Sequence, residues 1–135
     1  MPEGSCVCGK IRYSYEGEPS VKALCHCADC RKISGSAFST NILVSAEGFK
    51  VLSGTPKEYH KIADSGKPIV SFFCGDCGST MWRDAEVFGN NKIIKAGTLD
   101  DPDALNIHKP AAELYTQSRI KWVQEVEGAA QKIAM

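Results

Sequence analysis

Seven cysteines in a chain of 135 residues constrain the fold more than any other feature of the sequence. They fall into three clusters, Cys6-Val7-Cys8, Cys25-His26-Cys27-Ala28-Asp29-Cys30 and Cys74-Gly75-Asp76-Cys77. A disulfide scaffold normally has an even number of cysteines. The first residues, MPEGSCVCGKIRY, contain no apolar signal segment, so we expect a cytoplasmic protein whose thiols stay reduced. Metal binding is therefore preferred over disulfide bonds.

The spacing within the clusters predicts two zinc sites. Residues i and i+2 of an extended strand point to the same face, so Cys6 and Cys8 can reach one metal ion together, and so can Cys25 and Cys27. A C-x-x-C turn offers two thiolates to one zinc ion. The simplest division gives a structural site with four cysteines and a second site with three. The structural set is Cys6, Cys8, Cys74 and Cys77, and the second set is Cys25, Cys27 and Cys30.

The three-cysteine set points to catalysis, because a zinc ion with three protein ligands keeps a fourth position for water or a substrate atom. A rival division joins Cys27 and Cys30 to Cys74 and Cys77 as a zinc ribbon. It separates Cys25 from Cys27, although the two should share a strand face. His26 should point to the opposite face, so we expect it to be a packed or supporting imidazole and not the fourth ligand.

Composition and charge narrow the possible partners. Hydrophobic residues make up 43% of the chain and charged residues 24%, which suits one globular domain over residues 1–135. Lys and Arg together number 16, as do Asp and Glu, so the formal net charge is zero and no nucleic-acid partner is expected. No apolar run is long enough to span a membrane.

Local patterns predict a mainly β fold of many short strands. Residues 10–17 alternate Ile11, Tyr13 and Tyr15 with polar residues, as a half-buried strand does. Further strands are expected at 21–27, 36–45, 49–54, 57–63, 69–74 and 91–99. Short helical turns are expected at 28–35, ending at Gly35, and at 100–106. Residues 111–123 favour a strand only weakly.

Three segments carry a resemblance to a known family: GSCVCGKIRYSYEGEP, CHCADCRKISGSAFSTNILV and FFCGDCGSTMWR. With these cysteine spacings the chain resembles the glutathione-dependent formaldehyde-activating enzymes, a group that includes the centromere protein V domain. The resemblance implies a β-tent zinc fold of antiparallel strands and the same division of cysteines into four and three. It also implies a carbon–sulfur lyase type of activity, in which formaldehyde and glutathione condense to S-hydroxymethylglutathione.

The expected function is therefore a zinc-dependent enzyme acting on a glutathione adduct of formaldehyde or another small aldehyde. Cys25, Cys27 and Cys30 are the expected catalytic zinc ligands. Arg31 and Arg83 are candidates for binding a glutathione carboxylate, because guanidinium groups pair with carboxylates through two parallel hydrogen bonds.

The late segment KPAAELY departs from the family pattern, since Glu113 stands at about the place of a histidine. This departure supports an alternative in which the same zinc fold acts on a different electrophile, such as an imine. A non-catalytic zinc-binding interaction module is the third possibility.

Overall fold

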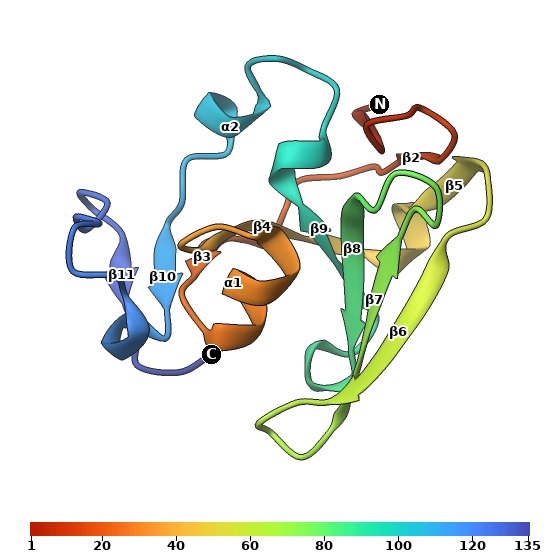
Figure 1. Cartoon of the computed structure of the whole chain (residues 1–135). Coiled ribbons are helices and arrows are strands. Elements are labelled where there is room, and N and C mark those ends of the chain that lie inside the picture. Colours follow the sequence, from red (N-terminus) through yellow and green to blue (C-terminus); the bar gives the residue numbers. More distant parts are fainter.

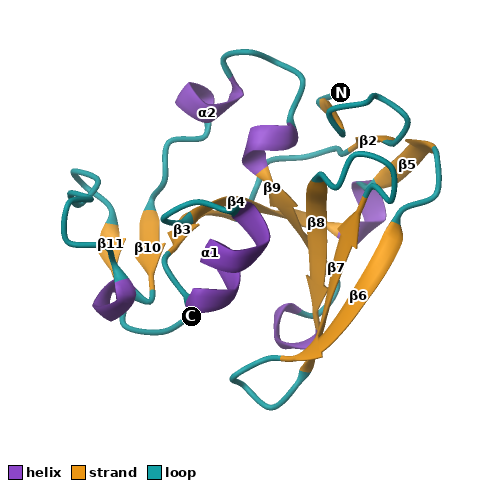
Figure 2. Ribbon diagram, in the orientation of Figure 1, coloured by secondary structure: helices purple, strands orange, loops and turns teal.

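The computed structural model describes residues 1–135 and shows a mainly β chain with short helices (Figures 1 and 2). The strands are β1 Glu3–Ser5, β2 Arg12–Ser14, β3 Val21–Cys25, β4 Ser39–Ser45, β5 Lys50–Ser53, β6 Lys57–Ile62, β7 Pro68–Phe73, β8 Thr80–Ala85, β9 Asn91–Lys95, β10 Ala112–Leu114 and β11 Ala130–Gln131. The helices are α1 Ala28–Ser34 and α2 Ala104–Ile107, with 3-10 turns at Ala46–Gly48, Glu86–Phe88, Ala96–Thr98 and Thr116–Ser118. No helix is both long and apolar enough to cross a membrane.

The strands form two sheets. The smaller has three strands in the order β1-β2-β5, and the larger has eight in the order β11-β10-β3-β4-β9-β8-β7-β6. All pairs are antiparallel except those of β10, which runs parallel to both β3 and β11. The expected antiparallel pairing is therefore found in every strand pair except these two. A parallel neighbour requires a long crossover connection, and the route from β3 through β9 and α2 to β10 supplies it.

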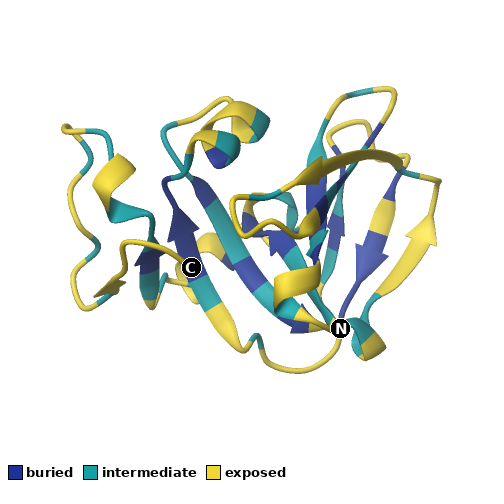
Figure 3. Cartoon of the chain, turned by 90° about the horizontal axis from the view of Figure 1, so that it is seen from below, coloured by how far each residue is buried: buried dark blue, intermediate teal, exposed yellow.

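The main core involves both sheets and surrounds Trp82. Trp82 stacks on Phe72 with ring centroids 5.2 Å apart and meets Tyr13 and Phe49 edge-on at 5.6 Å and 4.8 Å. Tyr13 comes from the small sheet and is fully buried. Figure 3 shows the buried strand segments in the interior, whereas β6 at the sheet edge is exposed along its whole length. Aromatic contacts of this kind add to the free energy gained by burial alone.

The predicted elements agree with the structure in type. The mainly β fold with short helical turns is confirmed, and α1 ends at Gly35, whose left-handed backbone (φ 61°) stops the helix. The weak prediction of a strand over 111–123 holds only for β10. Tyr115 follows β10 with φ 55°, a left-handed conformation that ends the extended chain, and Trp122 beyond it is 78% exposed.

The close approach of Gly4 to Tyr13 gives a first prediction. A Cβ atom at Gly4 would lie 2.2 Å from the ring of Tyr13, whereas one at the exposed Gly97 would meet nothing nearer than 4.0 Å. We expect Gly4→Ala to lower the free energy of unfolding by about 1–3 kcal/mol through overpacking. Gly97→Ala should change it by less than about 0.5 kcal/mol. Urea denaturation of the two variants measures this, and equal midpoints would contradict the packing argument.

Candidate functional site

Four cysteines meet where the β1–β2 connection approaches the β7–β8 connection. The Sγ atoms of Cys6, Cys8, Cys74 and Cys77 all lie within 4.8 Å of one another. The Sγ atoms of Cys6 and Cys8 are 3.5 Å apart, and those of Cys8 and Cys74 are 3.7 Å apart. Four sulfur atoms at about 2.3 Å from one tetrahedral zinc ion would be separated by roughly 3.8 Å. The cluster therefore has the donors and the spacing to hold a zinc ion between the two sheets.

Two glycine turns give this cluster its shape. The amide of Gly9 donates to the carbonyl of Cys6 at 2.9 Å, and the amide of Gly78 donates to the carbonyl of Cys74 at 2.8 Å. Both glycines have φ near 80°, which side chains rarely permit. The amide of Ile11 also donates to the Cys6 sulfur at 3.3 Å. The backbone thus positions the sulfur atoms, and the amide of Ile11 helps to lower the pKa of the Cys6 thiol.

The second cluster joins the end of β3 to α1. The Sγ atoms of Cys25, Cys27 and Cys30 lie within 4.8 Å of one another, and Cys25 and Cys30 are buried. Cys27 caps α1, because its sulfur accepts a hydrogen bond from the amide of Cys30 at 3.3 Å. The structure therefore brings together the same two groups of cysteines that the sequence suggests, and it does not place Cys27 and Cys30 with the four-cysteine cluster.

Three adjacent thiols cannot all ionise without a cation. The thiols of Cys25 and Cys27 donate toward the Cys30 sulfur and, with the positive charge of Lys95 nearby, lower the pKa of Cys30. The same contacts with Cys27 and Cys30, together with burial, raise the pKa of Cys25. Because metal binding requires thiolates, a divalent cation would release the remaining protons. The donor set fits a soft cation such as zinc.

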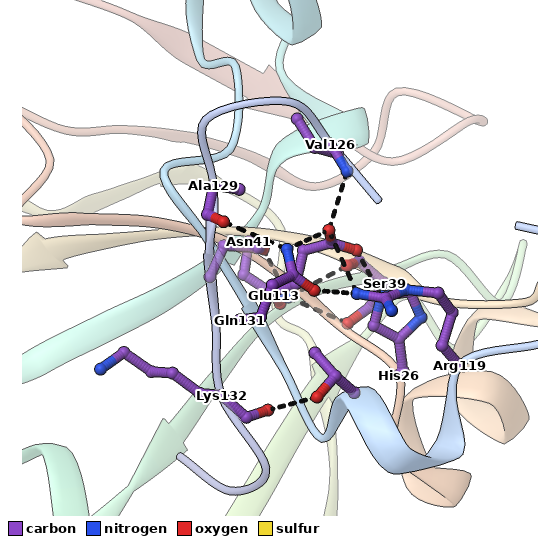
Figure 4. A network of polar contacts seen from close by, with 11 residues as sticks. His26, Ser39, Asn41, Glu113, Arg119, Val126, Ala129, Gln131 and Lys132 are labelled. Carbon is purple, nitrogen blue, oxygen red and sulfur yellow. Dashed lines mark hydrogen bonds and ion pairs between the residues drawn. The ribbon is translucent and has the colours of Figure 1, made fainter. Parts of the chain in front are cut away.

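A buried hydrogen bond joins His26, which lies between Cys25 and Cys27 in the chain, to Glu113 (Figure 4). His26 does not join the group of three sulfur atoms, and its Nε2 lies 2.8 Å from Oε1 of Glu113 on β10. Both side chains are fully buried. The amide of Val126 and the side chain of Gln131 donate to the other carboxylate oxygen at 2.9 Å and 2.8 Å. Arg119 approaches the same oxygen at 3.3 Å.

This carboxylate joins the C-terminal segment, residues 119–135, to the cluster. Burial alone would raise the pKa of Glu113, but the hydrogen bonds from Gln131, Val126 and His26, with the charge of Arg119, lower it to about 2. Glu113 is therefore ionised at neutral pH. The residue that departs from the family pattern thus bonds to the supporting histidine and to the C-terminal segment.

The three-cysteine cluster opens into a cavity of about 320 Å³. Of its 22 lining residues, 16 are hydrophobic. The eight-stranded sheet and α1 supply most of the wall, and Lys132 and Met135 supply part of it from the C-terminal segment. Figure 1 shows this end of the chain beside α1. A small ligand in the cavity would be near the three sulfur atoms.

The two arginines that the sequence suggests for binding a carboxylate lie in different places relative to the cavity. Arg83 on β8 is 6% exposed and lines the cavity, whereas Arg31 on α1 is exposed and does not line it. Lys95 and Tyr115 are among the cavity residues that sequence reasoning missed. The alternation of β9 could have indicated Lys95, since it shares a strand face with Ile93. No sequence signal indicates the left-handed backbone that directs Tyr115.

Comparisons with known proteins agree with this architecture. A sequence model of a family described as glutathione-dependent formaldehyde-activating enzyme matches residues 1–118. No curated protein sequence gives a significant match. The crystal structure of a Rhodobacter sphaeroides protein, determined as a structural-genomics target, is similar with a TM-score of 0.64. Its sequence is 15% identical, and the match covers 80% of this chain and 96% of that one. At this identity the likeness concerns the fold.

The buried carboxylate of Glu113 gives the second prediction. Glu113→Gln removes its charge and leaves an amide group facing donors, so we expect the free energy of unfolding to fall by about 3 kcal/mol. Glu125→Gln makes the same change at an exposed position of the C-terminal segment and should have little effect. Urea denaturation and limited proteolysis of residues 119–135 measure both.

The difference in the free energy of unfolding between the wild type and Glu113→Gln should also depend on pH. Because the pKa of Glu113 is about 2 in the folded chain against an ordinary value of 4.5, its stabilisation is complete above about pH 5 and is lost as the pH falls toward 2. The gap in stability between the wild type and Glu113→Gln should therefore narrow over that range. A gap that stays constant would show that the carboxylate charge is not responsible.

Proposed function

Because the chain belongs to the family of glutathione-dependent formaldehyde-activating enzymes, we propose that it is a zinc enzyme that joins a thiol such as glutathione to formaldehyde or another small aldehyde. The observation that carries this proposal is the position of Cys25, Cys27 and Cys30. These three thiols form part of the wall of a cavity that can admit a small molecule. A site with a purely structural role would have no need of such a cavity.

Each cluster is assigned a separate role. The four-cysteine cluster would hold a structural zinc ion with a complete set of protein ligands. The three-cysteine cluster would hold a zinc ion with a position left for a ligand from the cavity. Zinc in this second site would supply a cation that favours the thiolate form of a bound thiol and polarises a nearby carbonyl oxygen.

The reaction forms one carbon–sulfur bond. The thiol sulfur attacks the carbonyl carbon, the carbonyl π electrons move to oxygen, and the proton lost by the thiol ends on that oxygen as a hydroxyl group. Tyr115 is placed to assist, because it lines the cavity and burial raises the pKa of its hydroxyl. A protonated phenol can donate a hydrogen bond to the oxygen as negative charge develops there. The hydrophobic wall limits the access of competing water.

A second candidate retains the zinc site but changes the electrophile, for example to an imine. The hydrophobic character of the cavity favours it, since glutathione has two carboxylates and an ammonium group that need polar partners. Glu113, the departure that first suggested this candidate, is fully buried beside His26 and does not line the cavity. A non-catalytic interaction module would leave the cavity beside the cluster without a purpose.

Zinc content gives the third prediction. Native mass spectrometry of the wild type should show two zinc ions per chain. Cys27→Ser should lose one ion and stay folded, whereas Cys77→Ser should lose the other and unfold at much lower denaturant. Structural zinc sites contribute roughly 10–16 kcal/mol of apparent binding free energy in small zinc domains, so even partial loss is large. Ser36→Ala, an exposed position just after α1, should retain both ions. Two ions in Cys27→Ser would overturn the assignment.

Formaldehyde exchange gives the fourth prediction. Because formaldehyde and glutathione also combine without an enzyme, the informative quantity is the rate at which ¹³C-formaldehyde exchanges with its glutathione adduct at equilibrium, measured by exchange NMR. The zinc-loaded wild type should accelerate this exchange, and Cys27→Ser should reduce the enzymatic part by about 100-fold or more. Ser36→Ala is the control. No acceleration by the wild type, with hydrolysis of a small imine instead, would favour the second candidate.

A further inference from the structure

One face of the eight-stranded sheet forms the floor of the cavity. Pairing register places Asn41 opposite both Ala23 and Lys95, and Arg83 opposite both Ile93 and Ser71. Directly opposed residues share a sheet face, and alternate residues of a strand share it too. Arg83 and Lys95 therefore project from neighbouring strands, β8 and β9, on the same side as Cys25 at the end of β3. Both line the cavity.

Arg83 lacks the partners that a buried guanidinium group normally has. It is 6% exposed, makes no ion pair, and donates no hydrogen bond to the protein. Its Nε is buried and unsatisfied. Ser71, directly across on β7, is 3% exposed, and its hydroxyl also has no partner. Buried charged groups are normally paired, so this arrangement is what a site built for an anion would show.

Lys95 adds a second cation to the same floor. It is 9% exposed, and its ammonium group donates to the amide oxygen of Asn41 at 2.7 Å, a neutral partner. The two acidic residues of the cavity wall do not neutralise these cations. Asp29 is ion-paired with Lys61, and Asp64 lies on the exposed 63–66 turn. The floor therefore carries two positive charges with no carboxylate against either.

If zinc occupies the three-cysteine cluster, the charges of the metal site and of Arg83 and Lys95 do not cancel, and one positive charge remains without a partner. A zinc ion with three thiolates has a formal charge of −1, which can offset one of the two cations; this step rests on the proposed zinc site. We propose that Arg83 and Lys95 form a carboxylate-binding subsite on the floor of the cavity. Arg83 presents the two parallel donors that fit a carboxylate, and Lys95 contributes a point charge beside it.

The size and polarity of the cavity define the ligand further. At about 320 Å³ it lies at the lower end of the volumes of small-molecule sites. Apart from the cations, its wall is mostly hydrophobic. The fitting ligand is a small monocarboxylate with an apolar body. Its carboxylate belongs either to the thiol, as in a mercapto acid, or to the electrophile, as in an oxo acid.

Binding to the zinc-loaded protein tests the subsite without any turnover. Propionate and propionamide have the same shape and differ in charge, so calorimetric titration should show propionate binding at least about tenfold more tightly. Equal affinities would overturn the subsite. Because neither ligand has a thiol or a carbonyl that reacts, this result is independent of formaldehyde exchange, so failure of the subsite and failure of the proposed function are separate observations.

Single substitutions test whether Arg83 and Lys95 cause the preference for propionate over propionamide. Arg83→Gln should bring the affinity ratio of propionate to propionamide close to one, and Lys95→Met should lower it severalfold. Lys92→Met removes the same charge from β9 but on its opposite face, where Lys92 pairs with Asp84, and should leave the ratio unchanged. Zinc content and the far-ultraviolet circular dichroism spectrum verify that each variant is folded. If Arg83→Gln kept the wild-type ratio while folded, the assignment would be wrong.

Two reactive probes then identify the source of the carboxylate. A preference for 3-mercaptopropionate over 3-mercaptopropionamide that Arg83→Gln abolishes places the carboxylate on the thiol. The same dependence for glyoxylate, with no preference between the two thiols, places it on the electrophile. Either result supports the subsite. Loss of zinc from Arg83→Gln, together with no preference for any carboxylate in the wild type, would instead assign the cations to charge balance alone and overturn the inference.

Discussion

Four sulfur atoms that meet between two sheets are the contact on which the remaining architecture depends. Cys6 and Cys8 lie on the connection that follows β1, and Cys74 and Cys77 on the connection between β7 and β8. Cys6 and Cys74 are also members of the main hydrophobic cluster around Trp82. A metal ion here would tie the small sheet to the large one at the same place where their aromatic side chains pack. Short strands with a modest core gain order from such a cross-link.

The two faces of the eight-stranded sheet have different surroundings: one packs against the hydrophobic core, and the other lines the cavity. One face presents Trp82, Ile94 and their neighbours to the aromatic core. The other face presents Arg83, Lys95 and the start of the three-cysteine cluster to the cavity. Alternation along β8 and β9 produces this separation, because consecutive residues point to opposite faces. Arg83 and Lys95, which have no carboxylate partner, thereby lie on the cavity face, whereas the charges of Lys92 and Asp84 on the other face pair with each other.

The carboxylate of Glu113 connects the three-cysteine cluster to the end of the chain. It bonds to His26, which lies between two of the cysteines, and to Val126 and Gln131 in the C-terminal segment. That segment also supplies Lys132 and Met135 to the cavity wall. The family match ends at residue 118, so this part of the wall comes from outside the matched region. The C-terminal segment therefore shapes the cavity from outside the region that the family model describes.

The sequence by itself determined the type of fold and the grouping of the cysteines, because both depend on local geometry. Strand alternation and glycine turns operate over a few residues, and C-x-C or C-x-x-C spacing decides which sulfur atoms can converge. Only the tertiary structure decided what surrounds the second cluster. Arg83 and Lys95 are 12 positions apart in the sequence, yet strand register places them on one floor. Glu113 meets His26 because β10 runs parallel to β3, a long-range pairing that no local pattern specifies.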